Sequence, residues 1–151
     1  MKVYRITKRK YAADLSGRGA AINAGRWNRQ GTHLIYSAST RALAVLECLV
    51  HLDGALLAVA DFVLLTLQLP SAEAAEFTQA NVLEAFRDGT PKERLQSIGD
   101  QFVHDGEALY CHVPSLVLPE EHNILINPRH PDAAEIQIVH QRPFHFDRRL
   151  G

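Results

Sequence analysis

Apolar residues cluster along the chain in short runs that predict strands separated by turns. Runs of strand length occupy residues 3–6 and 33–36, and residues 65–69 alternate apolar and polar side chains with the period of two that is typical of a half-buried strand. Further runs predict strands at residues 108–113, 123–127 and 135–139, and a final edge strand at residues 143–146. Glycine, proline, serine and asparagine lie between these runs, as expected for connecting loops.

One amphipathic helix is predicted directly after the run at residues 33–36. Ser39 is a suitable N-cap, because its hydroxyl can accept a hydrogen bond from a free backbone N–H of the first turn. At about 100° per residue, one broad apolar arc follows, and Glu47 lies at its edge, with His51 one turn later on the same side. The arc consists of Ala42, Leu43, Val45, Leu46, Leu49 and Val50.

A second helix is predicted from the capping box that begins at Thr90, with Pro91 at the first helical position. This helix would run to about His104 and end at Gly106. Its inward-facing residues would be Leu95, Ile98 and Phe102. Residues 71–86 are compatible with a further helix but carry only a weak pattern. Because strands and helices alternate without a regular βαβ rhythm, the prediction is an α+β fold in one domain that spans residues 1–151.

Composition and charge narrow the function classes. With 16 basic and 17 acidic residues the net charge is −1. The sequence has no basic stripe, so we do not expect direct binding of nucleic acid. The longest apolar run, residues 58–69, is too short and too polar to span a membrane. Cys48 and Cys111 occur in apolar contexts without a CxxC motif, so we expect reduced core thiols in a cytoplasmic protein without an export signal.

Three residues on consecutive predicted elements are candidates for chemistry. Glu47 beside an apolar arc is either a boundary residue that reaches water or a cleft carboxylate that stabilises positive charge. Arg26 follows Gly25 and could bind a phosphate or carboxylate, although a surface ion pair or stacking on Trp27 would also account for it. Tyr36 ends a strand and either offers its ring to a planar group or lies at the core edge with its hydroxyl in water.

Several familiar motifs are absent from the sequence. Ser115 follows a predicted strand but lies outside any GxSxG elbow, and the eight histidines show no recognisable metal-binding spacing. No GxGxxG motif or P-loop is present, so a Rossmann cofactor site and a nucleotide triphosphatase are not expected. We therefore predict no bound metal and no bound cofactor.

The assembled pattern is more specific than its parts, and it resembles the RES domain. The resemblance rests on the segment Gly25-Arg26-Trp27-Asn28, on residues 34–37 and 42–51, and on two C-terminal segments, 113–123 and 125–132. Residues 143–150 also resemble the usual end of that family. The arginine, glutamate and serine that give the family its name correspond here to Arg26, Glu47 and Ser115.

This resemblance implies the fold of ADP-ribosyltransferase toxins and the toxin role in a toxin–antitoxin pair whose antitoxin is Xre-like. It implies NAD as substrate rather than cofactor, with cleavage of the nicotinamide–ribose bond. The catalytic residues would be Arg26 at the pyrophosphate, Tyr36 at the nicotinamide, Glu47 at the ribose and Ser115 as a hydrogen-bonding partner of the substrate. Further substrate contacts would come from Gly25, Trp27, Asn28, Ser37, His51 and Asn127.

The same candidate residues are compatible with other functions. The acceptor of the ADP-ribose group could be water, phosphate or a protein, the last of which makes an ADP-ribosyltransferase. A non-enzymatic alternative is a module that only binds its antitoxin. On either account we expect an antitoxin that covers the cleft, with a higher-order toxin–antitoxin complex as one further outcome.

Overall fold

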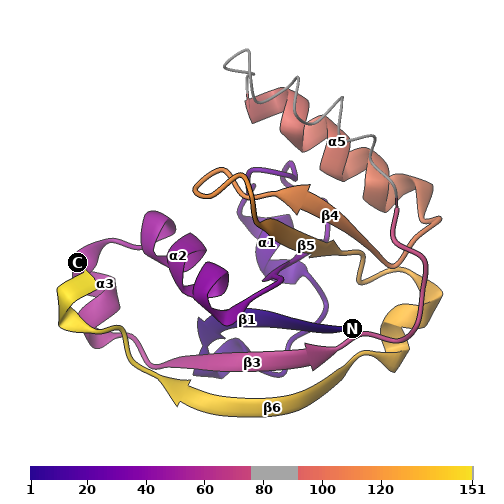
Figure 1. Ribbon diagram of the computed structural model, residues 1–151. Helices are drawn as coiled ribbons and strands as arrows, with labels where there is room; N and C mark the ends of the chain where they lie inside the picture. The colour runs from indigo at the N-terminus through magenta and orange to yellow at the C-terminus, as the bar shows by residue number, and fades with distance from the viewer. Residues whose placement is uncertain (76–91, 151) are drawn as a thin grey trace.

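A single antiparallel sheet organises the chain in the computed structural model, which describes residues 1–75 and 92–150 (Figure 1). The strands follow the order β4-β5-β2-β1-β3-β6. The strands are β1 (Lys2–Lys8), β2 (Ile35–Ala38), β3 (Phe62–Gln68), β4 (Tyr110–Pro114), β5 (His122–Ile126) and β6 (Gln137–Phe144). The helices are α1 (Arg18–Ile22), α2 (Arg41–His51), α3 (Gly54–Val59) and α5 (Lys92–Asp105), with 3-10 turns at Arg9–Tyr11, Pro131–Glu135 and Arg148–Leu150. The predicted α+β fold is confirmed.

The sheet is weakly joined at its centre. β1 pairs with β3 in a continuous register from Lys2 opposite Gln68 to Lys8 opposite Phe62. By contrast, the described register between β1 and β2 contains the single pair Tyr4 and Ala38. The sheet therefore divides into a β4-β5-β2 half and a β1-β3-β6 half, which separate beyond that pair.

Helices α2 and α5 pack on the sheet through different clusters. Leu43 and Ala44 of α2 contact Tyr4, Ile6 and Ala38, which places α2 over the junction of the two halves. On α5, buried residues pack with residues of β4 and β5, as the position of α5 beside β4 in Figure 1 also shows. The residues in this second cluster include Leu95, Phe102, Cys111, Val113 and Leu125.

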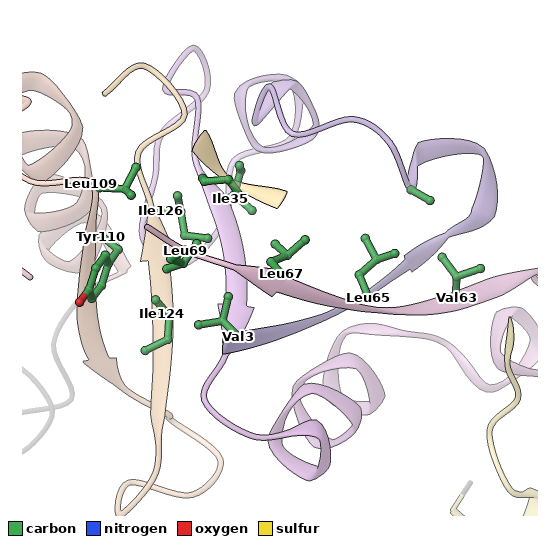
Figure 2. Packing of buried hydrophobic residues seen from close by; sticks show 12 residues of the cluster. Val3, Ile35, Val63, Leu65, Leu67, Leu69, Leu109, Tyr110, Ile124 and Ile126 are labelled. Carbon is green, nitrogen blue, oxygen red and sulfur yellow. The ribbon is translucent and has the colours of Figure 1, made fainter. Parts of the chain in front are cut away.

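The largest apolar cluster joins both halves of the sheet, as Figure 2 shows. It contains Val3, Leu65 and Leu67 from one half, and Ile35 and Ile126 from the other. The prediction of a half-buried strand at residues 65–69 was wrong, because residues 62–67 of β3 are buried on both faces. β3 lies between β1 and β6, so neither edge of the strand is free either.

The start of α2 differs from the prediction by one residue. The N-cap is Thr40, whose Oγ1 accepts a hydrogen bond from the backbone N–H of Leu43 at 3.1 Å. The carbonyl of Thr40 also accepts the first helical hydrogen bond, from the N–H of Ala44 at 3.1 Å, whereas Ser39 still pairs with the sheet through its N–H and the carbonyl of His122. β2 correspondingly ends at Ala38, two residues later than predicted.

The apolar arc of α2 is less buried than its pattern predicted. Among the residues of this helix only Leu43 and Ala44 are buried, and the side chain of Val50 is 55% exposed. One side of α2 faces a cleft instead of the core, as described below. The sequence pattern could not distinguish these two environments.

Helix α5 agrees closely with the prediction. It ends at Asp105, and Gly106 follows with a φ of 63°, a left-handed conformation that favours glycine. Leu95 and Phe102 are buried and Ile98 is partly buried. Thr90 and Pro91 lie outside the described residues, as does most of the weak helix predicted at residues 71–86, of which residues 71–75 are not helical.

The C-terminal region contains one strand where the pattern predicted two. β6 is one edge strand from Gln137 to Phe144, and its register against β3 shifts between Thr66 and Leu67. Pro143 is accommodated within it opposite Val63, because an edge strand tolerates a residue that cannot donate a ladder hydrogen bond. The short helices α1 and α3 were not predicted. No helix in the described part of the chain has the length and apolar character needed to cross a bilayer.

Candidate active site

A cleft of about 610 Å³ opens where β1 and β2 separate. Its walls are formed by residues 4–6 of β1, residues 23–26 of the loop before β2, residues 36–38 of β2, one side of α2, Leu52 and Asn123 of β5. Three of the predicted catalytic residues, Arg26, Tyr36 and Glu47, line this cleft together. They reach it from a loop, a strand and a helix, as the order of elements predicted.

Glu47 is held by two strong hydrogen bonds to one of its oxygens. Oε1 accepts from the hydroxyl of Ser115 at 2.6 Å and from the side-chain amide of Asn123 at 2.6 Å. No donor to Oε2 is found among residues 1–75 and 92–150. The carboxylate is thus fixed in orientation at the cleft wall while one oxygen keeps its accepting capacity.

Ser115 orients Glu47 and has no remaining capacity for a substrate. Its Oγ donates to Glu47 and accepts from the backbone N–H groups of Val117 and Leu118, each at 3.1 Å. A hydroxyl has one donor and two lone pairs, so all three are used. Ser115 is buried and does not line the cleft. We therefore correct its expected role from substrate contact to support of the carboxylate.

Asn123 was quoted in the family resemblance without a role, and the structure assigns it one. It lies on β5 opposite Val113 of β4, near the end of the strand pair that leads to Ser115. Its amide donates to Glu47 Oε1, and it contributes to the cleft wall. A polar residue in the apolar run 123–126 was the available signal, but that residue finds its partner only because α2 packs on β1 and β2 and brings Glu47 within reach.

Tyr36 presents its ring to the cleft and hides its hydroxyl. The hydroxyl donates to Asn28 Oδ1 at 2.6 Å and accepts from the backbone N–H of Trp27 at 3.0 Å. Burial raises the pKa of Tyr36 well above its ordinary value, so the phenol stays neutral. Of the two interpretations of Tyr36, the one with its hydroxyl in water was wrong. A Cβ atom at Gly25 would lie 2.5 Å from this hydroxyl, so the loop depends on glycine here.

Arg26 is exposed at the cleft and keeps its guanidinium available. No hydrogen bond or ion pair joins its side chain to another residue in the described part of the chain. The loop around it is well fixed, since the N–H of Gly25 lies 3.1 Å from both oxygens of Asn28. A guanidinium on a fixed loop beside a cleft can bind an anionic group with two parallel hydrogen bonds.

Three predicted substrate contacts lie elsewhere. Trp27 packs in the cluster beneath α5, and Asn28 is fully buried with its amide bonded to the carbonyls of Ala20 and Arg29. Asn127 is also buried, where its Oδ1 accepts from the N–H of Arg129. None of the three lines the cleft, so we assign them to the scaffold.

The remaining predicted contacts do line the cleft. His51 is exposed on the last turn of α2, and Ser37 donates to the carbonyl of Ile124 at 2.8 Å. Cys48 lines the cleft too, which corrects its prediction as a core residue. Its burial is partial but raises the pKa of the thiol to about 11, so the unreactive protonated form prevails at neutral pH. Cys111 is a free, buried thiol as predicted.

Arg5 is a cleft residue that the sequence reasoning missed. It lies on β1, contributes to the cleft wall, and its Nη1 is buried without a hydrogen-bond partner among the described residues. Burial lowers the pKa of this guanidinium, and the charge of Asp14 opposes that effect. A buried donor without a partner is costly, which makes an anionic ligand a favourable partner for it. An arginine within the apolar run at residues 3–6 was the signal for it.

The described residues contain no group of three or more histidine, cysteine, aspartate or glutamate side chains that could hold a metal ion. The charged and ring-bearing side chains among the described lining residues of the cleft are Glu47, two arginines, Tyr4, Tyr36 and His51. Among its described lining residues, Glu47 is the only acidic one.

Comparison with known proteins places the chain in a defined family. In three dimensions the chain is similar to a solved chain of the Mycobacterium tuberculosis MbcT-MbcA toxin–antitoxin complex, with a TM-score of 0.76 over 95% of this chain and 84% of that one. At 18% identity this likeness shows the fold alone. The sequence model of the RES domain matches residues 2–147. The chain belongs to the RES domain family, as its motifs predicted.

Two curated relatives cover most of the chain. It is 40% identical to the Prs ADP-ribosylating toxin of Sphingobium sp. (strain YBL2), over 92% of this chain and 88% of the relative. It is 32% identical to Toxin Res of Yersinia enterocolitica (serotype O:8, biotype 1B), over 99% of both chains.

Proposed function

We propose that this protein is the toxin of a toxin–antitoxin pair and that it degrades NAD by cleaving the bond between nicotinamide and ribose. The observation that carries the proposal is Glu47 in a cleft of about 610 Å³: one oxygen of its carboxylate is anchored, and the other accepts no hydrogen bond from the described residues. Membership of the RES family and relatives named as toxins support the toxin role.

Glu47 fits the charge that this reaction develops. As the C1′–N bond breaks, its electron pair leaves with nicotinamide and the ribose becomes oxocarbenium-like. A fixed carboxylate close to that ring stabilises the positive charge. Water or phosphate then adds at C1′ and releases a proton. Because Glu47 is the only acidic residue among the described lining residues, we propose no second carboxylate and no covalent glycosyl-enzyme.

Arg26 and Arg5 would bind the pyrophosphate of the dinucleotide. Arg26 offers an exposed guanidinium, and Arg5 offers a buried Nη1 whose hydrogens have no described acceptor. Two guanidinium groups in one cleft match the two charges of a pyrophosphate. The ring of Tyr36 would pack against the nicotinamide, and its buried hydroxyl would hold the loop that carries Arg26.

The test is NAD consumption by the purified protein, with nicotinamide and the ADP-ribose product measured together. Glu47→Gln keeps the shape and the hydrogen-bonding length of the side chain but removes its charge. We expect a fall in kcat of at least about a hundredfold, in the range seen when one electrostatic group is removed. Glu107→Gln, at an exposed position outside the cleft, is the matched control and should retain activity. Activity of Glu47→Gln equal to wild type would refute the proposal.

A second candidate reaction is transfer of ADP-ribose to a protein. The relative named as a Prs ADP-ribosylating toxin, 40% identical to this chain, specifically favours it. Both reactions break the same bond and differ only in the acceptor. NAD labelled in the adenosine moiety separates them: free labelled ADP-ribose or its phosphorylated form supports degradation, whereas label attached to a protein of a cell lysate supports transfer.

An antitoxin partner forms part of the proposal. The structural neighbour was solved as a toxin–antitoxin complex, and we infer an antitoxin of Xre-like type that covers the cleft here. The non-catalytic alternative assigns growth inhibition to binding alone. Expression in bacteria separates these accounts, because Glu47→Gln and Arg26→Ala should both abolish growth inhibition if the activity is enzymatic. If both variants inhibit growth like wild type, the binding-only account is correct.

A further inference from the structure

Gln96 of α5 is a buried polar residue whose side chain, within the described part of the chain, hydrogen-bonds to the loop that carries Arg26. Its side-chain amide donates to the carbonyl of Gly25 at 2.9 Å and to the carbonyl of Asn28 at 3.1 Å. The two acceptors flank Arg26 and Trp27 on either side. An amide NH₂ has two hydrogens, and each is used on this loop.

The same side of α5 holds the loop at two more points. At Gly99 the helix approaches so closely that a Cβ atom would lie 1.7 Å from the carbonyl oxygen of Trp27. One residue later, Asp100 accepts hydrogen bonds from the backbone N–H and the guanidinium of Arg29, both at 3.0 Å. Gln96, Gly99 and Asp100 have the spacing of one helix face.

The loop is therefore held between α5 and β2. On the β2 side the hydroxyl of Tyr36 binds Asn28 and the N–H of Trp27. Arg26 itself forms no hydrogen bond or ion pair with the described residues, so only its backbone determines where its guanidinium lies. Any change that loosens the backbone at residues 25–28 should spread the positions of this charge.

We propose that Gln96 is a positioning residue for anion binding in the cleft, acting through the carbonyls on both sides of Arg26. This inference rests on the proposed function, because it assigns α5 to the recognition of the pyrophosphate. It also predicts that the residues supporting substrate binding are separate from those supporting the chemical step. Ser115 and Asn123 hold Glu47 from β5 and the segment after β4, without contact to the Arg26 loop. Loss of Gln96 should weaken substrate binding and leave the chemical step intact.

The experiment compares Gln96→Met with Gln101→Met in the NAD consumption assay. Methionine matches the length of glutamine but donates no hydrogen bond. Gln101 is exposed on the same helix, and among the described residues its side chain bonds to Asp105 alone. We expect Gln96→Met to raise KM about tenfold while kcat stays within about twofold, as for the loss of one or two hydrogen bonds. Gln101→Met should match wild type in both constants.

Thermal unfolding of each variant shows whether it is folded. If Gln96→Met does not fold, Gln96→Asn replaces it, because the shorter amide cannot reach both carbonyls. An unchanged KM in a folded variant would overturn the proposal, and so would a loss of kcat as large as that of Glu47→Gln.

Binding of inorganic pyrophosphate, measured by calorimetry, separates this inference from the proposed function. Weaker binding in both Gln96→Met and Arg26→Ala supports the positioning role even if the protein does not consume NAD. Equal binding by wild type and Gln96→Met, or no binding by wild type, refutes it.

Discussion

At the scale of single residues, the site separates groups that meet the substrate from groups that hold them. Glu47 and Arg26 line the cleft, whereas Ser115, Asn28 and Gln96 are buried and bind the backbone or side chain of another residue. The sequence identified Glu47 and Ser115 as a pair through the family resemblance. It could not show that they bind each other, because 68 positions separate them and only packing of the strands brings them together.

Asn123→Asp tests how much the orientation of Glu47 contributes. The substitution keeps the shape of the side chain but replaces its NH₂ donor with an acceptor 2.6 Å from Glu47 Oε1. Two carboxylates at this distance repel, so one of them takes up a proton or Glu47 moves away. We expect kcat for NAD to fall at least about tenfold at neutral pH.

Gln141→Glu is the control for Asn123→Asp. It introduces the same change of charge at an exposed position on β6, at the far edge of the sheet. Its kcat should equal that of wild type. Full activity of Asn123→Asp would show that the bond to Glu47 has no influence on the reaction.

Arg5→Met should weaken NAD binding without lowering the stability of the fold. The substitution removes a buried charge whose Nη1 lacks a partner among the described residues, and it keeps the apolar stem. We expect the free energy of unfolding, measured in urea, to stay the same or rise by about 1 kcal/mol. At the same time KM for NAD should rise at least about tenfold, because one guanidinium at the pyrophosphate is lost.

The opposite result for Arg5 would also be informative. If Arg5→Met unfolds at lower urea and binds NAD like wild type, the arginine serves the fold and not the ligand. Lys8→Met on the same strand provides the comparison, since Lys8 does not line the cleft.

At the scale of elements, local patterns predicted most strands and two helices, and they failed where tertiary contacts decide. α5 was predicted well over its described residues, because its apolar spacing and the glycine at its end, Gly106, both agree with the helix. The alternation of apolar and polar residues in β3 predicted a strand with one exposed face. Thr66, a polar residue of that predicted exposed face, is buried together with its apolar neighbours. Burial of β3 depends on β1 and β6, which are distant in sequence, and no local period reports it.

Thr40→Ala should destabilise α2, because Thr40 caps the helix. It removes the acceptor for the N–H of Leu43 and the donor to Glu121. We expect a loss of about 1 kcal/mol, which for a domain of this size lowers Tm by about 2–4 °C. Ser39→Ala changes the neighbouring hydroxyl, which does not cap the helix, and should shift stability by less than about 0.5 kcal/mol. Equal losses in the two variants would contradict this assignment of the cap.

At the scale of the whole molecule, the cleft is a consequence of the divided sheet. β1 and β2 separate beyond Tyr4 and Ala38, and the space between them is bounded by α2 above the junction. Local sequence could predict each strand but not the gap, because a gap is set by which strands fail to pair. Arg5 escaped prediction for the same reason: its burial depends on the position of β1 at the edge of that gap.

A bound dinucleotide should therefore stabilise the molecule by connecting the two halves of the sheet. Arg5 lies on β1, Tyr36 on β2 and Glu47 on α2, so one ligand would contact elements that share a single described strand pair. Glu47→Gln is suited to this test because we expect it to bind NAD without consuming it. At a ligand concentration about 100 times Kd, the added stability is about 2.7 kcal/mol, and Tm should rise by about 5–10 °C. Amide hydrogen exchange should slow most in β1 and β2 and least in β6, which lies at the outer edge. A rise in Tm with uniform protection would indicate binding away from the cleft, and no rise would remove NAD as its ligand.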